Sequence, residues 1–177
     1  QELTGNKFPS DYHVRDDKGD LHFSKTIGTF GRGLKLILYK QTNYIENLST
    51  IFHEYGHMVS LHGLYSNGSP DDIGSLEEAC AFAFECAGLF QTADTYFELG
   101  IEGLRKFSKD NFLRAKSYYT KDNALDRHDE GSAIFLATYS VLRDPFATVN
   151  YLLDKPNSEF TELSPEITEM MQIHKRI

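Results

Sequence analysis

The sequence predicts an α+β fold in which a small N-terminal sheet precedes a mainly helical part. Residues 1–42 are rich in turn-forming residues and contain short apolar runs typical of strands. From about residue 43, apolar residues recur at helical spacing instead. The chain has 177 residues, enough for one domain with a full core. We therefore expect a single domain over 1–177, with a strand-bearing part at about 1–42 and a helical part at about 43–177.

The predicted sheet is small and mixed or antiparallel. Residues 33–40 (Gly-Leu-Lys-Leu-Ile-Leu-Tyr-Lys) are the best strand candidate, because this short apolar run is followed by a polar segment. Leu21, Phe23 and Ile27 lie earlier, among glycines and aspartates, and are compatible with shorter strands.

The helical part begins near Ile45. Apolar residues of the first predicted helix form one stripe that should face the core: Leu48, Ile51, Phe52, Tyr55 and Val59. Gly63 is a suitable stop for this helix. A second helix over about 75–91 is apolar almost all round, so we expect it to be largely buried. Further helices are predicted at about 93–120, 130–143, 145–154 and 164–175.

Charge and cysteine content exclude several classes of partner. The formal net charge is −8, which argues against sequence-independent binding to nucleic acid. No signal peptide is visible in this sequence. We expect no membrane span, since no apolar run is long enough to cross a bilayer. Cys80 and Cys86 should be buried free thiols, because six residues of helix separate them and apolar residues flank both. The lack of a disulfide framework favours a reducing compartment such as the cytoplasm.

The most specific motif is His53-Glu54-Tyr55-Gly56-His57, which reads H-E-x-x-H. Two histidines four residues apart on a helix lie on one face, so both imidazoles can reach one Zn²⁺ ion. The glutamate beside the first histidine can deprotonate a water bound to that ion. The motif therefore predicts a zinc site with His53 and His57 as ligands and Glu54 as general base.

A catalytic zinc ion usually has three protein ligands, so a third is needed. Glu77 and Glu78 open the second predicted helix about twenty residues after His57. Both carboxylates fit the loop length, so either can supply the third ligand. Glu85 shares a helix face with Glu78 and can hold a ligand histidine from behind.

This combination resembles the gluzincin metallopeptidases, which include thermolysin-like enzymes and zinc aminopeptidases. In that group the metal-binding glutamate lies in a pattern similar to Glu77-Glu78-Ala79-Cys80-Ala81, with Glu78 in the ligand position. The resemblance implies a zincin-like catalytic domain.

A later segment is similar to the Tyr-x-x-Gly pattern of aminopeptidase-type gluzincins. It runs from His128 to Leu136 and has His128 where that pattern has tyrosine. The resemblance implies that His128 donates a hydrogen bond to the oxyanion.

The predicted function is zinc-dependent hydrolysis of a peptide bond in a peptide or protein substrate. Endopeptidase activity is favoured, because the sequence shows no glycine-rich exopeptidase signature before the zinc motif. The alternative is a non-catalytic, helical protein-binding module with a structural or vestigial zinc site. The presence of Glu54 in the motif favours the enzymatic interpretation, since a structural zinc site does not need a general base.

Overall fold

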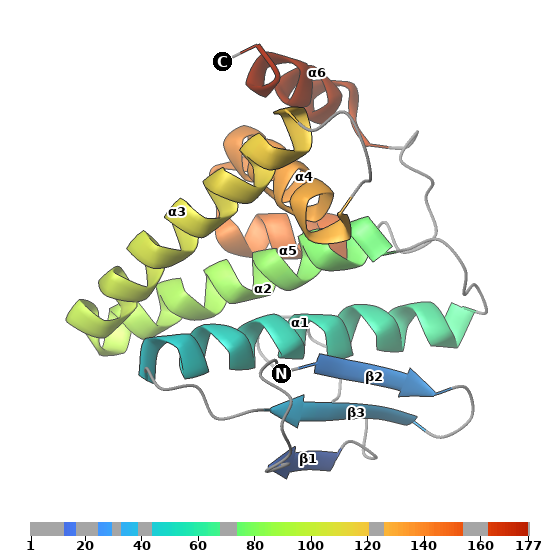
Figure 1. The fold of residues 1–177 in the computed structure, drawn as a ribbon, viewed down its shortest axis with the longest axis vertical. Coiled ribbons are helices and arrows are strands. Elements are labelled where there is room, and N and C mark those ends of the chain that lie inside the picture. The colour runs from blue at the N-terminus through green and yellow to red at the C-terminus, as the bar shows by residue number, and fades with distance from the viewer. Residues whose placement is uncertain are drawn as a thin grey trace.

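The fold is seen in a computed structural model of the chain (Figure 1). The backbone is described for residues 13–16, 25–29, 33–38, 44–67, 74–120, 126–153 and 163–176. Side chains are described for 44–60, 74–120, 126–153 and 163–176.

The predicted α+β class is wrong for the part of the chain whose side chains are described. This part is 92% helical and contains no strand. Its hydrophobic core is formed between helices, and every predicted site residue lies on a helix. The class was predicted from turn-rich composition and short apolar runs before residue 42, and these signals carry no information about what forms the core.

Three short backbone segments before the helices have strand geometry. They are β1 (His13–Asp16), β2 (Lys25–Thr29) and β3 (Gly33–Leu38). β3 pairs in parallel with β1 and in antiparallel fashion with β2. The predicted strand at 33–40 corresponds to β3, whereas Leu21 and Phe23 lie outside the described residues.

The helical part follows the predicted order closely. Its elements are α1 (Tyr44–Asn67), α2 (Gly74–Thr95), α3 (Phe97–Thr120), α4 (Arg127–Leu142), α5 (Pro145–Leu153) and α6 (Pro165–His174). α1 does not end at Gly63, because its backbone continues to Asn67. One residue of the predicted core stripe also differs, since Ile51 is 42% exposed. The other four, Leu48, Phe52, Tyr55 and Val59, pack against the core.

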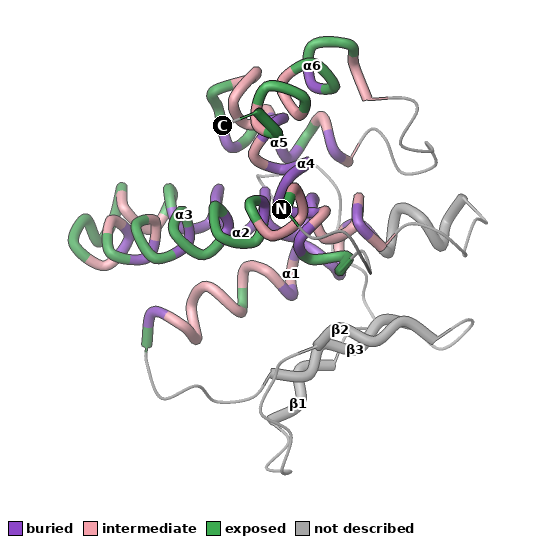
Figure 2. The backbone as a smooth tube through the Cα atoms, turned by 45° about the horizontal axis from the view of Figure 1, so that its top comes forward, coloured by how far each residue is buried: buried purple, intermediate pink, exposed green. Residues whose placement is uncertain are grey.

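The central element is α2, which contacts α1, α3, α4 and α5. Buried positions gather along α2 and α4 (Figure 2). Four alanines of α2 have no exposed surface: Ala79, Ala81, Ala83 and Ala87. Small side chains let neighbouring helices approach closely, so this helix is buried as its all-round apolar sequence predicts.

Candidate metal centre

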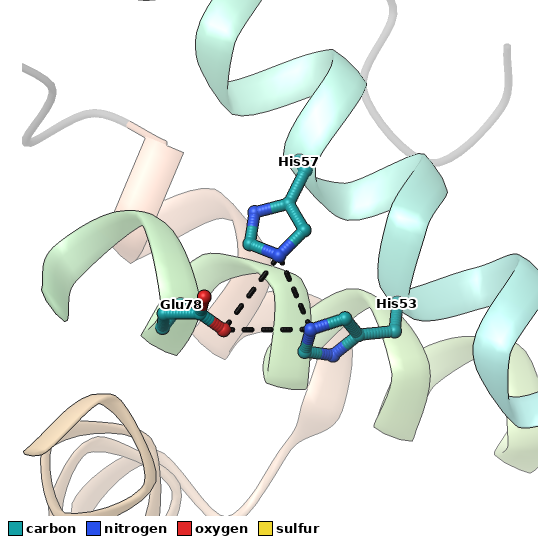
Figure 3. A group of neighbouring side chains, drawn as sticks. All are labelled: His53, His57 and Glu78. Carbon is teal, nitrogen blue, oxygen red and sulfur yellow. Dashed lines mark hydrogen bonds and ion pairs between the residues drawn. The ribbon is translucent and has the colours of Figure 1, made fainter. Parts of the chain in front are cut away.

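Two helices bring together the three predicted metal ligands. His53 and His57 are one turn apart on α1, and Glu78 lies in the first turns of α2 (Figure 3). The Nε2 atoms of the two histidines are 3.1 Å apart. Oε2 of Glu78 lies 3.4 Å from Nε2 of His53 and 3.6 Å from Nε2 of His57. The three atoms therefore form a nearly equilateral triangle and can hold a metal ion.

The size of the triangle fits zinc. Two ligands bound to Zn²⁺ at about 2.0–2.1 Å with a tetrahedral angle lie about 3.3–3.4 Å from each other. The three observed separations span that value. Oε2 of Glu78 is also buried without a hydrogen-bond partner among the described atoms. A buried carboxylate oxygen normally has a partner, and a cation between the three atoms would supply one.

The geometry distinguishes Glu78 from Glu77. Oε1 of Glu77 lies 3.0 Å from Nδ1 of His57, the nitrogen that faces away from the triangle. This distance suits an ion pair, although the contact lacks hydrogen-bond geometry. Glu78 rather than Glu77 lies close to both Nε2 atoms, so Glu78 is the glutamate that could complete a metal-holding group with His53 and His57.

A second carboxylate supports His53 from behind. Oε2 of Glu85 lies 3.2 Å from Nδ1 of His53, and Oε1 of Glu85 accepts a hydrogen bond from the hydroxyl of Ser49. Each histidine thus presents Nε2 to the triangle and Nδ1 to a glutamate of α2. Carboxylates in this position fix the tautomer and the orientation of metal-binding histidines.

The carboxylates also control protonation at the triangle. Burial alone would lower the pKa of His53, but Glu78 and Glu85 favour the imidazolium more strongly and raise this pKa to about 10. Burial alone would raise the pKa of Glu78, yet the close contact with His53 and the charges of His57 and His128 lower it overall. Without metal, a proton on His53 neutralises part of the charge, and a divalent cation would replace it.

Glu54, the predicted general base, lies beside the triangle. Its side chain is largely buried, and it lines a cleft of about 360 Å³ together with His53 and His128. α1 and α3 form the sides of this cleft, and Phe82 and Glu85 of α2 contribute to its lining. Glu54 and His53, one of the three residues that could hold a metal ion, thus line the same cleft.

His128 lies at the same site but faces Glu78. Its Nε2 is 3.3 Å from Oε1 of Glu78, and its Nδ1 is 3.2 Å from Oδ1 of Asp126. Asp126 also caps α4, since Oδ1 accepts a hydrogen bond from the backbone N–H of His128. In this conformation His128 holds the ligand carboxylate, and its ring would have to turn to reach an oxyanion. The predicted oxyanion role therefore stays a prediction.

Glycines allow the helices to approach closely at the site. A Cβ atom at Gly56, inside the H-E-x-x-H motif, would lie 2.6 Å from Cα of Ala81 on α2. A Cβ atom at Gly131 of α4 would lie 2.5 Å from Cβ of Glu78. Both glycines are thus required where α1 and α4 meet the ligand-bearing turns of α2.

Some residues of the site were not identified from the sequence. Ser49 lies one turn before His53, but its role depends on the position of Glu85 across the helix interface. Asp126 carries a recognisable signal, because an aspartate just before a helix is a typical N-cap. Cys80 and Cys86 are free and buried, as predicted, and the candidate metal-holding group found among the described residues does not include them.

Comparisons of the chain with known protein families, with curated proteins and with solved structures give no significant match. Among the described residues, no helix combines the length and apolar character needed to cross a membrane.

Proposed function

We propose that the chain is a zinc-dependent hydrolase that cleaves peptide bonds, with an active site of the gluzincin type. The observation that carries this proposal is the triangle of His53 Nε2, His57 Nε2 and Glu78 Oε2, whose edges match those of a tetrahedral zinc site. Three protein ligands leave one position for water, which is typical of catalytic rather than structural zinc sites.

His53, His57 and Glu78 would hold the ion. When bound, zinc lowers the pKa of water towards neutrality and polarises a carbonyl group. Glu54 then accepts a proton from the attacking water and passes it to the leaving amine. Glu77 and Glu85 keep the imidazoles oriented, since each lies against an Nδ1 atom.

His128 acts at the edge of the cleft in this proposal. It holds Oε1 of Glu78 in the resting state and donates to the substrate oxyanion after its ring turns. About half of its side chain is exposed, which leaves room for that rotation.

The test is digestion of a diverse peptide library, read by mass spectrometry, with wild type and Glu54→Gln in parallel. The zinc content of both proteins is measured first. We expect about one zinc ion in each, cleavage by wild type, and a loss of at least about 100-fold in the variant, because general-base catalysis contributes about 10²–10⁴-fold. The cut sites would distinguish endopeptidase from exopeptidase activity.

A second variant checks the metal assignment. In the His53→Ala, His57→Ala double variant we expect loss of both zinc and cleavage. Full zinc occupancy in this variant would refute the ligand set. Bound zinc without cleavage by wild type would instead favour a non-catalytic protein-binding module.

A further inference from the structure

Among the described residues that line the cleft beside the metal triangle is an arginine that the proposed chemistry leaves unused. Arg114 lies on α3, is exposed, and lines the same cleft as His53, Glu54 and His128. Arginine carries its charge at every accessible pH and presents a planar fork of donors suited to a carboxylate. Its place on the wall of a cleft therefore bears on which substrates the site accepts.

Other polar groups along this wall are already engaged. Lys106 forms ion pairs with Glu46 across the cleft at 3.0 Å and with Asp110 at 3.9 Å. Asn111 donates to the backbone carbonyl of Phe107 and accepts from the hydroxyl of Ser132. These contacts hold α3 in place and leave little capacity for a ligand.

Arg114 differs from Lys106 in both partners and position. Within the described part of the chain it forms no ion pair, whereas Lys106 is matched by two carboxylates. The two residues are eight apart on α3, so about 12 Å of helix separates them. Lys106 lies at the end of the cleft formed by the first turn of α1, and Arg114 lies two turns further along α3.

Arg114 lies on the side of the cleft near the start of α4. The pKa of Asp126 is lowered, mainly by the hydrogen bond from the backbone N–H of His128 and in smaller part by the charge of Arg114. Asp126 contacts His128, which contacts the ligand Glu78. Arg114 thus lines the cleft together with His53 of the metal triangle and with His128, which contacts Glu78.

We propose that Arg114 determines substrate specificity by binding a carboxylate of the peptide next to the scissile bond. This inference rests on the proposed function. Three of the carboxylates that line the cleft already have partners, because Glu85 contacts Ser49 and His53, and Lys106 pairs with both Glu46 and Asp110. The carboxylate can come from an acidic side chain or from the C-terminus of the substrate, since both have the same chemistry.

The test measures binding rather than turnover. Short peptidyl hydroxamates anchor to an open metal site, and cobalt-substituted protein reports their binding through its visible spectrum. Four probes are compared: Leu-Glu and Leu-Gln that carry the hydroxamate on an N-terminal malonyl group (HONH–CO–CH₂–CO–), each with a free C-terminal carboxylate and as the C-terminal amide. We expect wild type to prefer a carboxylate-bearing probe by about tenfold or more, because a bidentate hydrogen bond between a guanidinium and a carboxylate is about twice as strong as one between neutral groups. Preference for Glu over Gln would identify the side chain, and preference for the free acid over the amide would identify the C-terminus.

Arg114→Gln should abolish this preference and leave binding of the uncharged Leu-Gln amide unchanged. Lys106→Gln is the matched control, since it removes a cation from the same wall but should keep the preference. Equal binding of all four probes by wild type, or a preference that survives in Arg114→Gln, would overturn the inference about Arg114 but leave the proposed function standing. If no hydroxamate changes the cobalt spectrum, the open metal site is refuted, and both the proposed function and this inference fail.

Discussion

Gly131 of α4 lies directly against Glu78 of α2, and a Cβ atom added at Gly131 would be 2.5 Å from the Cβ atom of Glu78. The same added atom would lie 2.9 Å from the backbone oxygen of Ser75. These neighbours are backbone and Cβ atoms, so they cannot move away independently of the helices. Gly131→Ala should therefore displace α4 from α2, lower the free energy of unfolding by about 1–3 kcal/mol and weaken zinc binding. Chemical denaturation and zinc competition measure the two effects.

Gly103→Ala is the matched control for this substitution. Its added Cβ atom would meet the tip of the Leu89 side chain at 2.7 Å, and a rotamer change can relieve that contact. Alanine is also favoured over glycine in a helix by about 1 kcal/mol. We expect nearly unchanged stability and zinc affinity. A Gly131→Ala protein as stable as Gly103→Ala would contradict the close helix contact described at Glu78.

Glu77 and Glu85, which lie against the Nδ1 atoms of the two histidines, should increase metal affinity without binding the ion themselves. Glu85→Gln removes the negative charge behind His53 but keeps the shape of the side chain. Because loss of such a partner typically costs 10–100-fold in metal affinity, we expect a rise in the zinc dissociation constant of that order. Competition with a fluorescent chelator measures it.

Glu77→Gln extends the same comparison to His57. The contact between Glu77 and His57 lacks hydrogen-bond geometry, so we expect the zinc dissociation constant to rise less in Glu77→Gln than in Glu85→Gln. We expect both Glu77→Gln and Glu85→Gln to retain one zinc ion. Glu78→Ala should instead lose tight zinc binding, which would distinguish the proposed ligand from its two supporting glutamates. Loss of all zinc in Glu77→Gln would instead mean that Glu77 is a direct ligand.

Asp126 should stabilise α4 in a manner that depends on pH. Its pKa is lowered in the fold, chiefly by the hydrogen bond from the backbone N–H of His128. The stabilisation by the carboxylate is therefore complete above its ordinary pKa of about 3.9 and is lost as the pH falls through the lowered value. Asp126→Ala should cost about 1 kcal/mol near neutral pH, whereas Asp126→Asn should cost much less because asparagine is also a good N-cap. Denaturation at pH 7 and pH 3 tests both expectations, and equal losses at the two pH values would contradict them.

The thiol of Cys86 should be inert in the folded protein. Burial is the main cause that raises its pKa to about 12, with a smaller effect from the charge of Glu85. Thiolate is the reactive form, so at pH 8 a disulfide reagent should react with Cys86 only after unfolding. Mass spectrometry after timed labelling, with and without denaturant, measures this. Rapid labelling of the native protein would show that the α2 core opens easily.

The sequence predicted those parts of the site that depend on local helix geometry. His53 and His57 converge because four residues of one helix fix their relation, whatever the rest of the fold does. The helices themselves were also predicted closely, since apolar periodicity is a local signal.

The remaining features depend on how helices pack against one another. Glu77 and Glu78 are adjacent in sequence, and only the docking of α2 on α1 at Gly56 decides which carboxylate reaches the Nε2 atoms. The contact of His128 with Glu78 likewise requires the approach of α4 at Gly131. The fold class failed for a related reason, because composition before residue 42 does not reveal that α2 forms the centre of the core.

The division of the metal triangle between α1 and α2 makes an ion at this site a cross-link between two helices. Two ligands belong to α1, and the third belongs to the helix at the centre of the core. The unfolded chain holds no such triangle, so binding should draw the folding equilibrium towards the native state by mass action, by about 2.7 kcal/mol when free zinc exceeds the dissociation constant 100-fold. The lifetime of the folded protein would then depend on the supply of zinc around it, independently of any substrate.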